Sequence, residues 1–300
     1  MTALDELLAA IKKIQGIDVY TVPDGVLIEH VRTVLAAAGP ARQLIYLNEN
    51  QIWWRGHKLA SATVYHSSKQ WLMYHPDPPH FNRASGPGEP TMYASRNWTT
   101  VACELGLKTG DLLQLIFCRV KPGLIVKADV VGEFEAVANS GLSLVDSAKS
   151  IELVEKMMRE DPELWDRTVL ADAFCAELFS QRIPKDRHER YKPTACIAWY
   201  LLQGQPTEAL MFPSVQKRGG MNVAVPKAVA DAKFEMLDSW VVKVRELGYD
   251  QFGGEFMKAS QGLDGDTIIW APQATWSHKY DWTLAHGLRV KSPDPTTAGK

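Results

Sequence analysis

Four short segments of this 300-residue chain carry side chains suited to binding an anion and to stabilising a cation. The first ends in Arg55, the second runs from Arg83 to Tyr93, the third holds Glu104 and the fourth holds Ser214. Guanidinium groups are planar donor forks that match phosphate oxygens, and an aromatic face attracts a cationic ring. A carboxylate can stabilise positive charge that develops during a reaction. These residue types suit a site that binds an anion and stabilises positive charge.

The spacing of these residues resembles that of the RES domain, a family named for its Arg, Glu and Ser. Ten residues separate Arg83 from Tyr93, and eleven separate Tyr93 from Glu104, in agreement with the family's spacing. Ser214 stands in a Phe-Pro-Ser-Val segment, and Asn222 lies shortly after it. The resemblance covers about residues 50–228. The 110 residues from Glu104 to Ser214 exceed the separation in compact family members, and the helical stretch 131–190 is the predicted insertion.

The resemblance implies that the substrate is NAD and that the nicotinamide–ribose bond is cleaved. Cleavage would pass through an oxocarbenium-like ribosyl cation, as in glycosidases, with Glu104 as the stabilising carboxylate. Arg83, Tyr93 and Ser214 complete the expected catalytic set. Arg83, Tyr93, Ser214, Arg55 and Asn222 are the expected NAD-binding residues. NAD is a substrate here, so no cofactor and no metal are expected.

Family members hydrolyse or phosphorolyse NAD, or transfer ADP-ribose to a protein, and many are toxins silenced by an antitoxin that covers the active site. We expect an NAD glycohydrolase or phosphorylase that depletes NAD as a toxin. The alternatives are an ADP-ribosyltransferase with a protein target, a non-catalytic nucleotide-binding module, and an interaction protein whose match is accidental. This chain is much longer than compact toxins. The extra layers on either side of the matched region favour a narrow cleft that admits water or phosphate more readily than a protein.

Each residue also has an ordinary interpretation. A lone loop arginine such as Arg83 is usually solvated, a strand tyrosine such as Tyr93 usually packs in a core, and Ser214 after a proline is typical of a turn. Arg55 can be a charge on an edge strand. Glu104 lies among apolar residues, where an unpaired charge is costly to bury. The joint spacing, and no single residue, carries the prediction.

Other candidate sites have weaker support in the sequence. His66, His75 and His80 lie near Asp77, but they lack the HxxxH or HxH spacing of a metal site. Ser214 lacks the G-x-S-x-G context of a serine hydrolase. The Gly-Pro-Gly at 86–88 is not followed by the GK[ST] of a phosphate-binding loop. The four cysteines show no CxxC spacing and indicate reduced core residues.

Periodicity and turn signals predict the elements that position these residues. Helices are expected at 4–14, 27–35, 99–107 with Thr99 as cap, 145–182 with Pro162 opening its second helix, 191–202 and 231–246. Strands are expected at 44–47, 52–54, 91–95, 112–120, 124–127, 209–212, 223–225 and 267–270. The segment from His75 to Pro90 is a long loop of the kind that often carries function.

Composition places the chain among ordinary globular proteins, with 46% hydrophobic and 23% charged residues. The formal net charge of −2 argues against a nucleic-acid partner. No apolar stretch approaches the roughly 20 residues of a membrane span, and the acidic N-terminus is unlike a signal peptide. These features predict a cytoplasmic protein without a membrane partner. They are compatible with either a monomer or a homo-oligomer.

We therefore expect an α/β (α+β) fold of the ADP-ribosyltransferase type. Its central sheet should be mixed, mostly antiparallel and split, and flanked by helices. Residues 1–47 would form an N-terminal helical pair, 48–230 the RES-like domain, and 231–300 a C-terminal extension packed on it.

Overall fold

The computed structural model describes residues 2–39, 44–60, 72–145, 147–184, 186–203 and 206–271. The helices are α1 Ala3–Gln15, α2 Asp24–Ala38, α4 Trp98–Glu104, α5 Glu133–Ser140, α6 Ala148–Glu160, α7 Pro162–Ser180, the 3-10 helix η1 His188–Tyr191, α8 Lys192–Gln203 and α9 Lys227–Lys233. The strands are β1 Leu44–Leu47, β2 Trp53–Leu59, β3 Thr91–Ser95, β4 Leu112–Val120, β5 Val126–Val130, β6 Ala209–Pro213, β7 Met221–Pro226, β8 Phe234–Gly248, β9 Gln251–Asp264 and β10 Thr267–Trp270.

In the described residues the strands form one mixed sheet with the order β1-β5-β6-β7-β3-β2-β4-β8-β9-β10. Only β5 and β6 pair in parallel, and all other neighbours are antiparallel. The junction of β2 with β3 is a single residue pair, Trp54 with Ser95, whereas β2 and β4 pair at seven positions. The sheet is nearly divided at this junction, which is called the split below, and the predicted mixed, mostly antiparallel sheet is confirmed. Its assignment to the ADP-ribosyltransferase type stays a prediction.

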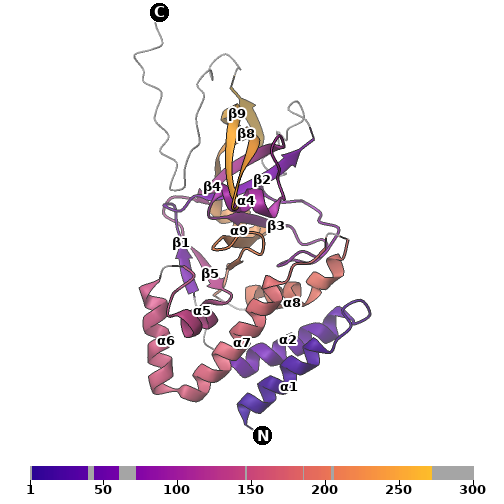
Figure 1. The fold of residues 1–300 in the computed structure, drawn as a ribbon, viewed down its shortest axis with the longest axis vertical. Coiled ribbons are helices and arrows are strands. Elements are labelled where there is room, and N and C mark those ends of the chain that lie inside the picture. The colour runs from indigo at the N-terminus through magenta and orange to yellow at the C-terminus, as the bar shows by residue number, and fades with distance from the viewer. Residues whose placement is uncertain are drawn as a thin grey trace, which may run out of the picture.

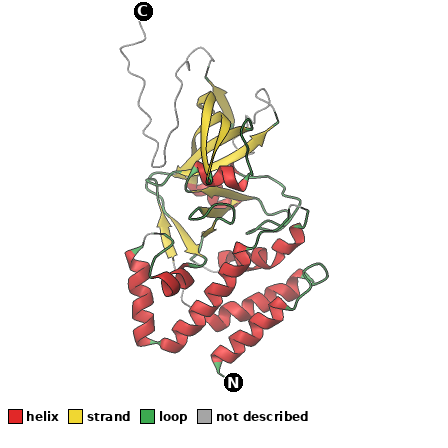
Figure 2. Ribbon diagram, viewed as in Figure 1, coloured by secondary structure: helices red, strands yellow, loops and turns green. Residues whose placement is uncertain are grey.

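The two halves of the sheet are covered differently (Figures 1 and 2). Most helices lie below the sheet in this view, and the long β8–β9 hairpin stands above α4. The predicted N-terminal pair is present as α1 and α2, which pack on each other and on α7 and α8. Helix α1 buries Leu7, Ile11 and Ile14 on one side, and Thr2 and Asp5 cap its first turn reciprocally.

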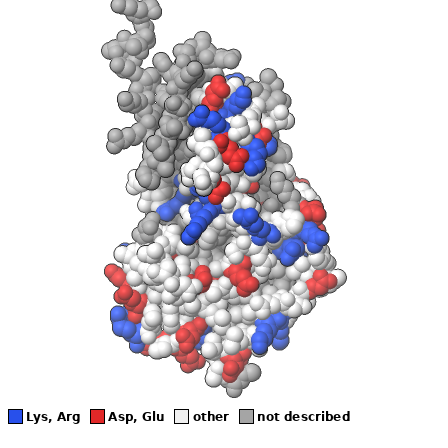
Figure 3. Space-filling model, in the orientation of Figure 1, with Lys and Arg blue, Asp and Glu red and all other residues white. Residues whose placement is uncertain are grey.

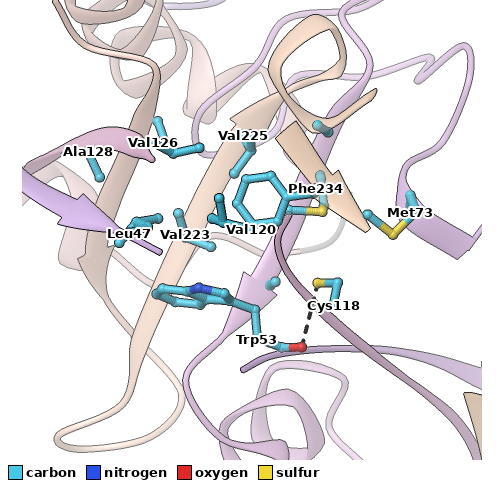
Figure 4. Packing of buried hydrophobic residues seen from close by; sticks show 14 of the residues in the cluster. Leu47, Trp53, Met73, Cys118, Val120, Val126, Ala128, Val223, Val225 and Phe234 are labelled. Atoms are coloured by element: carbon cyan, nitrogen blue, oxygen red, sulfur yellow. Dashed lines mark hydrogen bonds between the residues drawn. The ribbon is translucent and has the colours of Figure 1, made fainter. Parts of the chain in front are cut away.

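Alternation along the strands sends side chains into two cores on opposite faces of the sheet. One core holds Trp53 of β2 and Met92 of β3, together with valines of β5 and β7. Figure 4 shows this packing, in which the Cys118 thiol donates to the Trp53 carbonyl at 3.5 Å. The other face packs on the helices, and Tyr93 lies against that second core. Burying these apolar side chains is the main stabilisation of the fold, at about 25 cal/mol per Å².

The expected helix at 231–246 is wrong. Helix α9 ends at Lys233, and β8 continues as a strand that pairs with β4 from Phe234 to Lys243. The segment contains three valines, and its buried residues, such as Phe234 and Met236, alternate with less buried ones. A short apolar run is compatible with both the helical and the strand periodicity. In this segment, pairing with the neighbouring strands favours the strand. As a result the region after residue 230 extends the same sheet.

Strands β1, β3, β4 and β10 have the expected bounds, and most other expected elements are present with shifted ends, whereas the strand β9 was not expected. The 145–182 stretch is α6 and α7, with Pro162 at the first position of α7. The expected cap Thr99 is wrong: Asn97 caps α4, since its Oδ1 accepts the Thr100 N–H at 2.8 Å. Helix α4 ends at Glu104, before Gly106 adopts a left-handed conformation with φ of 61°.

Candidate functional site

The short helix α4 presents Glu104 at the split of the sheet. Asn97 fixes the start of the helix, and Val101 and Ala102 bury its inner side against Trp54 of β2. Glu104 is the last residue of the helix and is exposed, so its carboxylate stands at the surface. The apolar neighbours of Glu104 in the sequence face inward, whereas its carboxylate does not.

Two residues from the β6–β7 hairpin hold this carboxylate. The Ser214 hydroxyl donates to Glu104 Oε1 at 2.6 Å, and the Asn222 amide donates to the same oxygen at 2.8 Å. Ser95 of β3 donates to Asn222 Oδ1 at 2.6 Å, which turns the amide nitrogen toward Glu104. Ser95 and Asn222 are buried, at 4% and 8% exposure. The arrangement is a continuous chain of hydrogen bonds from the core to an exposed carboxylate.

The loop between β6 and β7 sets the direction of the Ser214 proton. Ser214 Oγ accepts the N–H groups of Gln216 and Lys217 at 3.3 and 3.0 Å. The hydroxyl has one proton, which goes to Glu104. Gly220 lets this loop approach α4, because a Cβ at that position would lie 2.8 Å from Thr100 Oγ1 and 3.0 Å from the Ser214 Cβ.

Tyr93 lies on the same face of β3 as Ser95, two residues away. Its hydroxyl accepts the Ala84 N–H at 3.1 Å and lies 2.9 Å from Ser85 Oγ. Burial raises the pKa of Tyr93 to about 12, so the phenol is protonated at neutral pH. Tyr93 therefore anchors the loop that carries Arg83.

Arg83 extends from that loop to the end of α7. Its terminal nitrogens donate to the carbonyls of Phe179 and Gln181, and the guanidinium lies 5.2 Å from the centre of the Tyr191 ring. These contacts hold a half-buried positive charge in one position. Arg83 is thus fixed by backbone carbonyls and a cation–π contact, and no hydrogen bond or ion pair among the described residues joins it to Glu104.

Arg55 is not brought into this cluster. It follows Trp53 by two residues in β2, so it shares the face of the core that contains Trp53, whereas Tyr93 points to the other face. Its guanidinium donates to the Leu72 carbonyl at 2.7 Å and to the backbone carbonyl of Tyr93 at 2.9 Å. Desolvation by burial lowers the pKa of Arg55 to about 10, which leaves it charged at neutral pH. The second bond bridges β2 and β3 beside the split, which is a structural role.

Sequence reasoning missed three residues of the site: Ser95, Lys217 and Gly220. Ser95 could have been found from strand alternation, because it lies two residues after Tyr93. Gly220 is the second of two adjacent glycines, which signals a close backbone approach. Lys217 gives no such signal, because its partner Asp250 lies 33 residues away.

The histidines near the long loop do not assemble a metal site. His75 Nδ1 accepts the Asp77 N–H at 3.2 Å, and the His80 ring stacks on the His188 ring at 4.5 Å. His66 lies outside the described residues. Within the part of the chain that the structure describes, no three His, Cys, Asp or Glu side chains are arranged to hold a metal.

No described helix is both long and apolar enough to cross a bilayer. All four cysteines are free.

Basic side chains lie across the middle of one face of the molecule, between the β8–β9 hairpin and the helices (Figure 3). The Arg182 guanidinium donates to the Val215 carbonyl of the β6–β7 loop at 3.4 Å. Two hollows among the described residues lie elsewhere, one lined by Asp129 and Asp172 and the other by Tyr74 and Lys227. The Glu104 side chain itself is exposed at the surface.

Comparison of the chain with protein-family models, curated proteins and solved structures gave no match. Its function is therefore inferred from the residues of the Glu104 cluster and from their geometry.

Proposed function

We propose that this protein cleaves the nicotinamide–ribose bond of NAD, as a glycohydrolase or phosphorylase. The observation that supports this most directly is the Glu104 carboxylate, which two neutral donors, Ser214 and Asn222, hold by one oxygen. Among the described residues no donor reaches Oε2, so this oxygen can accept a ribose hydroxyl. An exposed carboxylate fixed in this way suits a substrate that develops positive charge beside it.

In the proposed reaction the bond between ribose C1′ and the nicotinamide nitrogen breaks, and its electron pair leaves with nicotinamide. The ribosyl group becomes oxocarbenium-like, and Glu104 stabilises that charge. Water or phosphate then attacks C1′ and gives ADP-ribose or its 1-phosphate, with loss of one proton. Nicotinamide is a good leaving group, so the mechanism requires no second carboxylate and no metal.

The other residues would bind and orient the substrate. Tyr93 holds the Arg83 loop through Ala84 and Ser85, and Arg83 supplies positive charge for the pyrophosphate. Ser214 and Asn222 would fix the carboxylate while nicotinamide or ribose binds beside them. Arg55 is not assigned to the pyrophosphate, because it lies on the face of the sheet opposite the Tyr93 side chain.

In this proposal the enzyme works in the cytoplasm, depletes NAD as a toxin and is restrained by an antitoxin that covers the active site. The proposal favours water or phosphate as acceptor over a protein side chain, on the ground that additional layers narrow the cleft. Of the additional layers, the β8–β9 hairpin contacts the Ser214 loop through the Lys217 bond to Asp250, whereas α1 and α2 pack on α7 and α8.

The test is to mix the purified protein with NAD labelled in the adenosine half and to measure free nicotinamide. Release of nicotinamide, with label in ADP-ribose or its 1-phosphate, is the expected result. A parallel reaction in cell lysate distinguishes the alternative, because an ADP-ribosyltransferase would leave most label on protein. Binding of NAD without any nicotinamide release would instead identify a non-catalytic nucleotide-binding module.

A further inference from the structure

We propose that Lys217 is a positioning residue for Ser214, and that it acts by tying the Ser214 loop to the tip of the β8–β9 hairpin. The inference rests on the proposed function, because turnover is the process that Ser214 would serve. It assigns a role in the site to a part of the chain that lies beyond the region of the family resemblance.

The first observation is the backbone of Lys217. Its N–H donates to Ser214 Oγ at 3.0 Å, and the Lys217 carbonyl accepts the Gly220 N–H at 3.0 Å. Ser214 N–H in turn donates to the Gly220 carbonyl at 2.7 Å. Lys217 is therefore the residue through which the loop closes on itself around the Ser214 hydroxyl. A shift of its backbone would release the bond that directs the Ser214 proton to Glu104.

The second observation is the side chain of Lys217, which fixes that backbone from outside the loop. Its ammonium group donates to the backbone carbonyl of Asp250 at 2.8 Å. Asp250 is in the turn of the β8–β9 hairpin, where Tyr249 and Asp250 have φ values of 52° and 57°. Two consecutive residues with positive φ are typical of a tight type I′ turn, which points its carbonyls in defined directions.

The third observation is that the same hairpin braces the helix that carries Glu104. Trp98 of α4 contacts Phe252 of β9 edge to face at 6.3 Å, and β8 pairs along β4 from Val120 to Leu112. Figure 1 shows the hairpin directly above α4. The β8–β9 hairpin thus contacts both the helix that carries Glu104 and the loop that carries Ser214, the two partners of the 2.6 Å bond.

The alternative is that Lys217 acts as a plain cation that attracts an anionic substrate. Arg218 provides the matched control, because it is adjacent, exposed and carries the same charge. No hydrogen bond joins its guanidinium to any described residue. If the charge alone matters, removing it at Lys217 or at Arg218 should have the same effect on turnover. If Lys217 positions Ser214, only the change at Lys217 should lower turnover.

The experiment measures kcat and KM for nicotinamide release, and hydrogen exchange of the 214–220 loop, in Lys217→Met, Lys217→Arg and Arg218→Met. We expect Lys217→Met to lower kcat about ten- to hundredfold, as small misplacements of reacting groups do. Its loop amides should also exchange faster. Lys217→Arg should recover most of kcat, and Arg218→Met should keep kcat within about twofold. A double variant, Tyr249→Asn with Asp250→Gly, retains the turn and the carbonyl and should also keep kcat.

Equal increases in KM for Lys217→Met and Arg218→Met, with unchanged kcat and loop exchange, would overturn the inference. So would a Lys217→Met protein that matches the parent in both measurements. A parent protein that releases no nicotinamide would defeat the proposed function separately, and loop exchange would still report whether Lys217 holds the Ser214 loop.

Discussion

The Ser214 hydroxyl donates to Glu104 Oε1 at 2.6 Å, although 110 residues separate the two in the chain. Ser214 Oγ also accepts two backbone N–H groups, so its proton is directed to Glu104. The bond gives the carboxylate a fixed orientation while it remains exposed to solvent and substrate.

Replacement of Glu104 by glutamine tests this relationship. The glutamine carbonyl can still accept from Ser214 and Asn222, so we expect the fold and NAD binding to persist. The negative charge is lost, and turnover should fall about 10²–10³-fold, the effect of removing one electrostatic contact to a transition state. Nicotinamide release and thermal unfolding are the measurements. Glu152→Gln on the exposed side of α6 is the control, and wild-type turnover by the Glu104 variant would remove Glu104 from the mechanism.

Replacement of Arg55 by methionine should affect stability and leave substrate binding nearly intact. Hydrogen bonds to charged groups contribute about 1.5–3 kcal/mol each, and Arg55 makes two to backbone carbonyls beside the split. Chemical denaturation should show a clear loss of stability, with KM for NAD within about twofold of the parent. A large rise in KM without loss of stability would show that Arg55 does bind the pyrophosphate.

Arg83→Lys should affect both the stability of the fold and the binding of NAD. Lysine keeps the charge but lacks the planar fork that reaches the carbonyls of Phe179 and Gln181 together. We expect a lower unfolding midpoint and a higher KM for NAD, measured on the same preparation. Normal KM in the destabilised protein would confine Arg83 to a structural role.

Gly220→Ala should disable the site without unfolding the protein. The added Cβ would meet Thr100 Oγ1 at 2.8 Å and push the β6–β7 loop from α4, which breaks the Ser214–Glu104 bond. Turnover should fall at least about tenfold, in line with the sensitivity of catalysis to misplacement by about 1 Å. Gly25→Ala in α2 is the control, because a Cβ at that position would meet no atom within 4 Å. Unchanged turnover in the Gly220 variant would show that the loop can move without consequence.

Asp172 should make stability depend on pH. Burial raises the pKa of Asp172 to about 7, against the opposing hydrogen bonds from the N–H groups of Glu135 and Gly132. The unfolded carboxyl has a pKa of about 3.9, so the native state binds more protons between about pH 4 and 7. Its contribution to stability is complete below about pH 4 and is lost as pH rises through about 7.

The measurement is the urea midpoint at pH 5 and pH 7.5 for the parent, Asp172→Asn and Asp166→Asn. Asparagine does not titrate, so the Asp172 variant should lose part of the fall in midpoint between the two pH values. Asp166 is exposed on the same helix, and its variant should retain that fall. Identical slopes for all three proteins would contradict the role of Asp172.

Elements with local sequence patterns could be predicted before the structure was known. Helix α1 follows from its apolar spacing, α7 from a proline at its first position, and β4 from an apolar run of strand length. The sequence also identified Glu104, Ser214 and Asn222 as one group, and the structure joins them by hydrogen bonds. Local signals suffice where capping, periodicity and burial act within a few residues of one another.

Contacts between distant segments were needed to show on which face of the sheet each arginine lies, and that residues 234–248 form a strand and not a helix. Strand β8 forms because it pairs with β4 on one side and with β9 on the other. The residues of β8 alone do not indicate either pairing. The spacing predicts Arg55 and Tyr93 in one site, but strand alternation and the narrow β2–β3 junction send them to opposite faces. Pairing between distant segments sets register, and register sets the direction of every side chain on a strand.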